Sequence, residues 1–240
     1  MALIYHPGKN TPNQKGLLFL KSARTAGGSV KKFMIRTAQQ NSLKTATPDG
    51  ESLARDRQLG KGSHNAKSLK LIDSGDYDLF TVVRNPWDRF ISSLAYYAAN
   101  KKKYFEDIFL DKNGKLKLEK LDALKTKYGA KPKTAAKVLH PHHHLHMHLF
   151  SECCSLIEGI PSRALARANF RVLRFENLEN NIVALCQELG LKTNINDMTV
   201  LNRRGYKTER THYRKYYDAQ SRQFVLDFFE KDIKKFDYSF

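Results

Sequence analysis

Two stretches of this chain each join a short apolar strand to a turn that leads into a helix. The first, residues 16–29, passes from a strand into a turn of small residues rich in glycine. The second, residues 78–93, passes from another strand through Arg84 into a helix. Backbone N–H groups and the helix dipole at such a junction attract an anion. Two junctions of this kind predict a ligand with phosphate at two places.

The order of these patterns predicts an α/β fold. Strands that alternate with helices favour a mostly parallel central sheet with helices on both faces. A chain of 240 residues is long enough for one sizeable core, so we expect a single domain over residues 1–240. The predicted strands are 16–20, 79–83 and 170–175, and the predicted helices are 29–40, 87–100, 178–189 and 218–234.

Two further segments lack a strand pattern. Residues 101–137 form a Lys-rich insertion with helical segments, and we expect a solvated cap over the substrate side. Residues 41–63 are polar and contain a Pro-Asp-Gly turn, which predicts a loop.

The chain is strongly basic, with 42 Lys and Arg against 24 Asp and Glu and a net charge of +18. Such an excess attracts polyanions, whether nucleic acid, an anionic glycan or a phosphorylated cofactor. Nucleic-acid binding would favour basic residues interleaved with aromatics along one face. The basic residues here are spread out instead, so nucleic acid is not the partner we expect.

Cysteine usage and hydropathy both bear on where the protein is expected to reside, and the cysteines indicate a reducing compartment. Three cysteines, two of them adjacent, do not make a disulfide framework. No apolar run near the start is long enough for a membrane span or a signal-peptide core. We therefore expect a cytoplasmic protein without a membrane span.

The two junctions resemble the 5′-phosphosulfate loop and the 3′-phosphate motif of sulfotransferases that use 3′-phosphoadenosine 5′-phosphosulfate (PAPS). In the carbohydrate (Golgi-type, family 2) branch the first motif is Pro-Lys-Thr-Ala-Gly-Thr-Ser, and this chain has Ala23-Arg-Thr-Ala-Gly-Gly-Ser29. The second motif is similar almost residue for residue over 82–92, and later segments at 172–178, 213–218 and 232–238 also resemble the family. The resemblance covers about residues 16–240 and implies a P-loop-NTPase-like sulfotransferase fold.

The resemblance also implies a reaction. A sulfuryl group would pass in line from PAPS to an acceptor hydroxyl, leaving 3′-phosphoadenosine 5′-phosphate (PAP), with help from a general base. The family branch points to a carbohydrate acceptor, and the basic charge favours an anionic one. Sulfuryl transfer in this family requires no metal.

The first motif is expected to bind the 5′-phosphosulfate through its backbone and hydroxyl groups. Arg24 stands where the family has lysine, and we assign it a catalytic as well as a binding role. A guanidinium can hold the phosphosulfate with two hydrogen bonds but is a poor proton donor. Lys21 could supply part of that role, and a plain Gly-rich turn is the alternative interpretation. The predicted donor-binding residues of this motif are Arg24, Thr25, Ala26, Gly27, Gly28 and Ser29.

In the second motif, Arg84 and Ser92 are predicted to bind the 3′-phosphate. The alternative is a structural pair of Arg84 with Asp88 and a buried helix serine. Trp87 is expected in the core rather than against the adenine. Arg89 is expected to pair locally or to line the rim of the site.

The basic segment 202–207 lies where the family closes a loop over the donor. Its residues Arg203 and Arg204 would meet the 3′-phosphate or anionic groups of the acceptor, and a solvated loop is the alternative.

The general base is predicted to be His64, because it lies between the motifs where related glycan sulfotransferases have their histidine. Glu51 and Asp56 in the same loop are fallback bases. Residues 140–148 hold six histidines, which could bind a metal, face an anionic acceptor or cover a helix surface. No spaced cysteine pair accompanies them, so no metal site is predicted.

A P-loop kinase and a binding protein without catalysis are the alternative functions. A P-loop kinase needs Gly-x-x-x-x-Gly-Lys-Ser/Thr, and the chain has no such string. A degenerate sulfotransferase fold, or a basic protein that binds nucleotide or polyanion without catalysis, stays open because of Arg24.

Overall fold

The computed structural model describes residues 2–6, 15–45, 66–128, 149–150, 152–198 and 212–240. The chain divides into two compact units. The first comprises Met1–Val83 and Ser155–Leu201, and the second comprises Arg84–Cys154 and Asn202–Phe240. The expectation of a single domain stays a prediction.

The first unit is built on a sheet of four strands in the order β1-β2-β3-β4. β2 pairs in parallel with β3, and β3 in parallel with β4, while β1 is antiparallel to β2. The mostly parallel α/β fold is therefore confirmed, and β1 is an additional edge strand. The strands are β1 (Ala2–Tyr5), β2 (Gly16–Leu20), β3 (Tyr77–Val83) and β4 (Phe170–Arg174).

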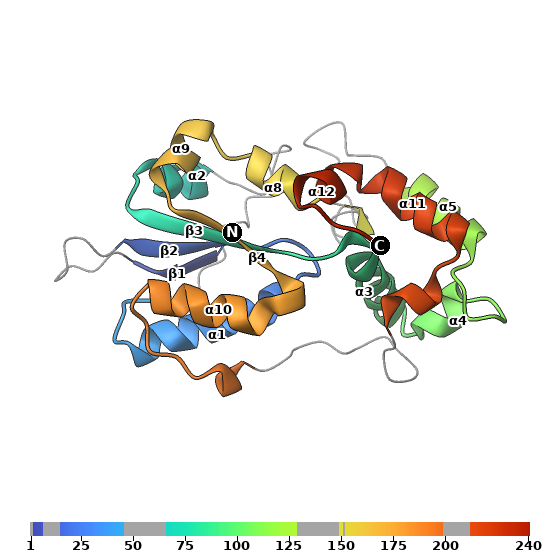
Figure 1. Cartoon of the computed structure of the whole chain (residues 1–240), viewed down its shortest axis with the longest axis horizontal. Coiled ribbons are helices and arrows are strands. Elements are labelled where there is room, and N and C mark those ends of the chain that lie inside the picture. The colour runs from blue at the N-terminus through green and yellow to red at the C-terminus, as the bar shows by residue number, and fades with distance from the viewer. Residues whose placement is uncertain (1, 7–14, 46–65, 129–148, 151, 199–211) are drawn as a thin grey trace. The chain divides into compact units, whose positions relative to one another are not determined.

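Two helices cover one face of this sheet, α1 (Gly27–Gln40) and α10 (Leu178–Glu188) (Figure 1). Leu17 and Phe19 of β2 belong to the core beneath these helices. The end of α10 has the predicted signal, because Gly190 has φ 69° and follows the helix as a left-handed cap.

The other face of the sheet is covered by α2 (Ala66–Asp73) and α9 (Ser162–Arg167), which the sequence did not predict (Figure 1). Leu18 and Leu20 of β2 belong to the core on this side. Because successive strand residues point to opposite faces, the unbroken apolar run of β2 is buried on both.

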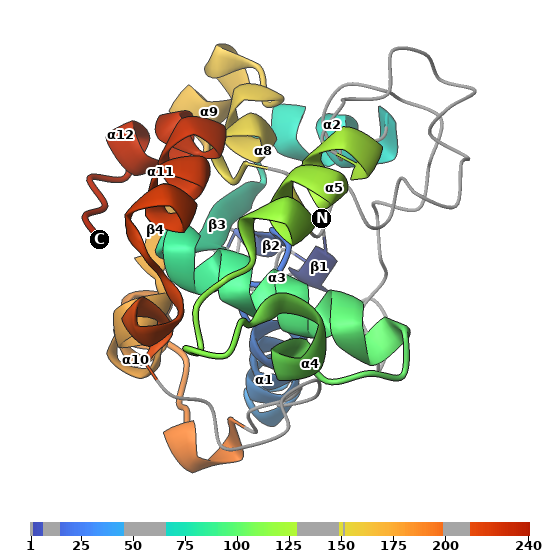
Figure 2. The same cartoon turned by 90° about the vertical axis from the view of Figure 1, so that its right-hand side faces the viewer.

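The second unit is helical, with α3, α4, α5 and α11 gathered in one group (Figure 2). The predicted helix over 87–100 is confirmed as α3, which begins with Pro86 in its first turn. The described part of the 101–137 insertion is helical, as expected. It is not a freely solvated cap, because Phe105, Phe109 and Leu121 are buried in the core of this unit. The helices of the second unit are α3 (Pro86–Asn100), α4 (Phe105–Phe109), α5 (Leu118–Tyr128), η3 (Tyr213–Tyr216), α11 (Ala219–Phe228) and α12 (Glu230–Lys235).

The single helix predicted over 218–234 is wrong, because the chain forms two helices that meet at Phe229. This residue leaves helical geometry, with φ −117° and ψ 26°. Its ring is buried, and the guanidinium of Arg89 lies 4.7 Å from the ring centroid. The break lets α12 turn so that Asp232 also reaches Arg89, at 3.0 Å.

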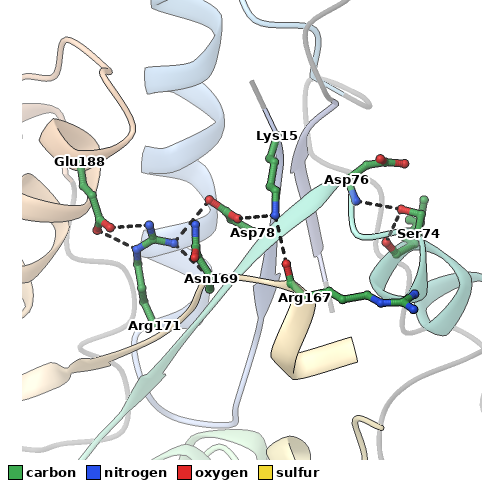
Figure 3. Close-up of polar contacts among 9 residues, drawn as sticks. Lys15, Ser74, Asp76, Asp78, Arg167, Asn169, Arg171 and Glu188 are labelled. Atoms are coloured by element: carbon green, nitrogen blue, oxygen red, sulfur yellow. Dashed lines mark hydrogen bonds and ion pairs between the residues drawn. The ribbon is translucent and has the colours of Figure 1, made fainter. Parts of the chain in front are cut away.

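A polar cluster lies at the amino end of β3 (Figure 3). The buried carboxylate of Asp78 lies 3.5 Å from Arg171 and 3.9 Å from Lys15. Arg171 also binds Glu188 of α10 through two hydrogen bonds. The pKa of Glu188 is lowered mainly by this hydrogen bond from Arg171. These contacts lie near the amino ends of the parallel strands. The turns that follow β2 and β3 lie at the carboxyl ends of these strands.

The remaining described elements are short. They are α8 (Cys154–Glu158), η1 (Phe175–Asn177) and η2 (Ile195–Asp197). Within the residues that the structure describes, none of the helices combines the length and apolar character needed to cross a membrane.

Asp232 is a buried carboxylate that joins several parts of the second unit through hydrogen bonds. It is 1% exposed and accepts hydrogen bonds from the backbone N–H groups of Cys153 and Cys154, each at 2.8 Å, besides the bond from Arg89. A buried carboxylate needs such a set of donors to offset the loss of its hydration.

We expect Asp232→Ala to lower the free energy of unfolding by about 3–5 kcal/mol, because Arg89 is then buried without its carboxylate. Urea denaturation measures the loss. Asp227→Ala is the control, because this exposed carboxylate on α11 binds only Gln223 among the described hydrogen-bond partners. It should change stability by less than about 0.5 kcal/mol. An equally small effect of Asp232→Ala would contradict the role given to this network.

Candidate functional site

The turn between β2 and α1 has a backbone that L-residues seldom adopt. Arg24 has φ 62° and Ala26 has φ 59°, both in the left-handed region although neither is glycine. Such a residue costs roughly 1–2 kcal/mol and persists only where its surroundings hold it. The predicted 5′-phosphosulfate loop is therefore a strained turn.

Hydrogen bonds from Ser22 and Thr25 hold this turn against the sheet. The Ser22 hydroxyl donates to the carbonyl oxygen of Val82 in β3 at 2.8 Å. Because its proton is used there, the Thr25 hydroxyl donates in turn to Ser22, whose Oγ lies 2.8 Å and whose carbonyl oxygen lies 3.3 Å away. Thr25 is fully buried, so its hydroxyl shapes the turn, and ligand binding stays a prediction for its backbone.

Helix α1 begins two residues earlier than the sequence predicted, at Gly27. Its N-cap is Ala26, which offers no capping side chain, and its first turn contains no acidic residue. The first intrahelical hydrogen bond runs from the N–H of Val30 to the carbonyl of Ala26 at 3.0 Å. A helix end without an acidic or capping side chain presents the positive end of its dipole to an anion.

Lys21 lies directly across this helix end. A Cβ added to Gly27 would lie 2.6 Å from Cγ and 2.9 Å from Cε of Lys21, so glycine leaves the room that the lysine stem occupies. Lys21 as a whole is exposed, and partial burial of its amine lowers its pKa from 10.5. The structure thus brings a second cation to the turn that contains Arg24.

At Gly28 the surroundings are open. Apart from its two chain neighbours and the backbone of its own helix, no atom of the described residues would lie within 4 Å of a Cβ placed there. Gly28 belongs to the first turn of α1, next to the lysine stem at Gly27. The first turn of α1 therefore has room beside it.

Arg84 is the residue that follows β3, and it belongs to the second unit. It is 4% exposed, and its Nε donates to Oδ2 of Asp88 at 2.6 Å. The structural pair that the sequence offered as an alternative therefore exists. A guanidinium carries five N–H donors in a fixed fork, so a partner at Nε is compatible with a phosphate at the other nitrogens.

Ser92 lies on the same face of α3 as Asp88. The two are one helical turn apart, and Ser92 is 7% exposed. Because residues four apart are neighbours on a helix surface, the partner of Arg84 and Ser92 form one polar row.

Two neighbours of these residues lie in the core. Trp87 is 2% exposed, as the sequence predicted, and its Nε1 donates to the carbonyl of Arg222 at 3.1 Å. Arg89 pairs with Asp232 and is 3% exposed, so it is a structural residue and does not line a rim.

Several predicted site residues lie outside the described residues. They are His64, its fallbacks Glu51 and Asp56, the pair Arg203 and Arg204, and the histidines of 140–148. Across the part of the chain that is described, no three His, Cys, Asp or Glu side chains form a group that could hold a metal. The three cysteines are free thiols, as their number suggested.

Sequence reasoning missed one residue of the first turn, Ser22. A small hydroxyl residue two positions after the end of an apolar strand is the signal that could have found it. The position of Lys21 over Gly27 has no such signal, because it depends on how the turn folds back.

A model of the sulfotransferase family matches residues 11–239 of this chain. The match spans both junctions and the segments that follow them. Comparisons with curated proteins and with solved structures give no match.

We expect Ala26→Val to destabilise the protein by about 1–2 kcal/mol, because a β-branched residue tolerates positive φ poorly. Ala26→Gly should leave stability unchanged or raise it by up to about 1 kcal/mol. Ala23→Val is the control, because Ala23 lies in the same turn without a positive φ. Thermal unfolding compares the variants, and equal losses for the two valine substitutions would show that the left-handed backbone is not the cause.

Proposed function

The chain belongs to the sulfotransferase family, and from that membership we propose that it transfers a sulfuryl group from PAPS to an acceptor hydroxyl. The acceptor that we propose is a carbohydrate, and the net charge of +18 favours an anionic one. The observation that carries the proposal is the strained turn before α1, where a helix end and Lys21 come together.

We assign the 5′ end of the donor to this turn. The residues Arg24–Ser29 and the first turn of α1 offer backbone N–H groups, and Lys21 and Arg24 offer positive charge. Two observations fit an anion here: the end of α1 has no side-chain cap, and the described residues leave space beside Gly28. Preorganised dipoles of this kind stabilise charge that develops during transfer, because they need no reorganisation.

We assign the 3′-phosphate to Arg84 and Ser92 in the second unit. Asp88 fixes the guanidinium plane of Arg84 through Nε, so its remaining donors keep a set direction. Both residues are largely buried, and charge-assisted hydrogen bonds are stronger away from water. Arg203 and Arg204 are proposed as further contacts of the 3′-phosphate or of the acceptor.

The donor supplies the sulfuryl group, which passes to the acceptor oxygen as the bond to the 5′-phosphate oxygen breaks. The leaving phosphate then carries more negative charge, which Lys21 and Arg24 would stabilise. Lysine can also release a proton, whereas arginine stays charged. Because burial lowers the pKa of Lys21, we propose Lys21 as the proton donor and Arg24 as the fixed fork.

The acceptor hydroxyl must lose its proton as its oxygen attacks. We propose His64 as the general base, since an imidazole takes up a proton near neutral pH. No metal is part of the proposal.

Arg84→Ala should weaken the binding of PAP by about 10- to 100-fold, because it removes charge-assisted hydrogen bonds worth roughly 1.5–3 kcal/mol. Calorimetric titration with PAP, AMP and ATP measures this. The control is Arg163→Ala, an exposed arginine paired with Asp73, which removes the same charge elsewhere. Equal binding of all three nucleotides by the unaltered protein would contradict the proposal, and selective PAP binding without turnover would indicate a binding protein.

The affinity for PAP should also fall at alkaline pH. The amine of Lys21 is charged below its pKa and neutral above it, and burial moves that pKa below 10.5. Attraction to phosphate is therefore present near pH 7 and decreases as pH rises through the lowered pKa. Titrations from pH 7 to about 10 should show the decrease in the unaltered protein and a flatter profile in Lys21→Arg, whose guanidinium stays charged. Identical profiles would exclude Lys21 from the phosphate site.

A further inference from the structure

The last two residues of this sequence are fastened to the start of α3. The side-chain amide of Asn85 donates from Nδ2 to the carbonyl oxygen of Ser239 at 2.9 Å. Its Oδ1 accepts from the N–H of Trp87 at 3.1 Å and so caps α3. One side chain therefore joins the first turn of this helix to the segment Ser239–Phe240.

The ring of Phe240 sits in a cage of aromatic and guanidinium groups. The ring of Trp87 meets it edge to face, with centroids 5.5 Å apart. Tyr213 and Tyr217 meet it in the same way at 5.8 Å and 5.6 Å, and the guanidinium of Arg222 lies 4.6 Å from its centroid. Edge-to-face aromatic pairs and cation–π contacts both stabilise the ring in this position.

The backbone of Phe240 is also held. Arg214 donates from Nη2 to its carbonyl oxygen at 2.7 Å, and the same guanidinium lies 5.7 Å from the ring centroid. The cage itself is bound to α3, because the Tyr217 hydroxyl donates to the carbonyl of Trp87 at 2.8 Å. Ring and backbone of Phe240 are thus fixed together against the first turn of α3.

These contacts converge on the residues beside Arg84. Asn85 is its neighbour in the chain, and Asp88, which fixes its guanidinium, lies in the first turn of α3. A change in the position of Asn85 moves the backbone of Arg84 and the direction of its fork. Recognition of phosphate by a guanidinium fork tolerates only about 0.5 Å of displacement.

We propose that Ser239 and Phe240 are positioning residues, which hold the Arg84–Asn85 turn in the geometry that recognises the 3′-phosphate. The inference rests on the proposed function, since it assumes that Arg84 binds this phosphate. It adds a determinant of donor selectivity that lies about 155 residues further along the chain.

The test compares PAP with AMP, which lacks only the 3′-phosphate. Phe240→Ala should weaken PAP binding by about tenfold and leave AMP binding unchanged, so that the ratio of the two affinities falls. Asn85→Ser should lower the same ratio, because serine still caps a helix but is too short to reach Ser239. Phe240→Tyr keeps the ring and should keep the ratio.

Phe228→Ala is the matched control. Phe228 is, like Phe240, a partly buried ring at the edge of the same core, but its ring contacts are with Phe150, Phe224 and Phe229. It should lower the melting temperature about as much as Phe240→Ala and leave the ratio of affinities unchanged. A melting curve of each variant gives the fraction folded before calorimetry.

Three results would overturn the inference, and they are distinguishable. If the unaltered protein binds PAP and AMP equally, the proposed function fails and the inference fails with it. If it prefers PAP, and Phe240→Ala and Asn85→Ser keep that preference, only the inference fails. If Phe228→Ala lowers the ratio as much as Phe240→Ala, the effect is general loss of structure rather than positioning.

Discussion

The hydrogen bond from Ser22 to the carbonyl of Val82 holds together the part of the molecule on which the proposed chemistry depends. It ties the turn after β2 to the last residues of β3, while Thr25 closes the turn from inside. Two left-handed residues within three positions would otherwise relax, because each costs free energy in isolation. The strain is kept in the turn to which the proposal assigns the 5′ end of the donor, and strained backbone is common at binding sites.

In the second unit, buried polar side chains rather than a turn hold separate elements together. Asp232 collects donors from Arg89 and from the backbone at Cys153 and Cys154, which fixes α12 against α3. Asn85 makes a second connection, because it binds Ser239 and caps α3. Helix α12 and the residues that follow it are therefore tied at two points to α3, the helix that follows Arg84.

The sequence predicted β2, β3, β4 and α3 because their signals are local: apolar runs for β2 and β3, alternation of apolar and polar residues for β4, and Asn85-Pro86 before a helix. It missed β1, which is only four residues long and gains its stability from pairing with β2. It joined α11 to α12 because the apolar spacing continues through Phe229, whose change of direction depends on Arg89. The candidate site residues followed from motif resemblance, and the place of Ser22 shortly after β2 is a signal that could have been used. The path of Lys21 over Gly27 depends on tertiary contacts that no spacing encodes.

Arginine at position 24 is the departure that most affects how the proposed reaction could proceed. The position has φ 62°, so its side chain leaves a left-handed backbone, and a guanidinium there gives direction but no transferable proton. Lys21 comes shortly before Arg24 in the sequence, and its side chain lies over Gly27. An amine whose pKa is lowered by burial releases its proton more readily than an exposed lysine does. Fixed charge and mobile proton, which one lysine combines at the matching family position, would then be divided between two residues of the same turn.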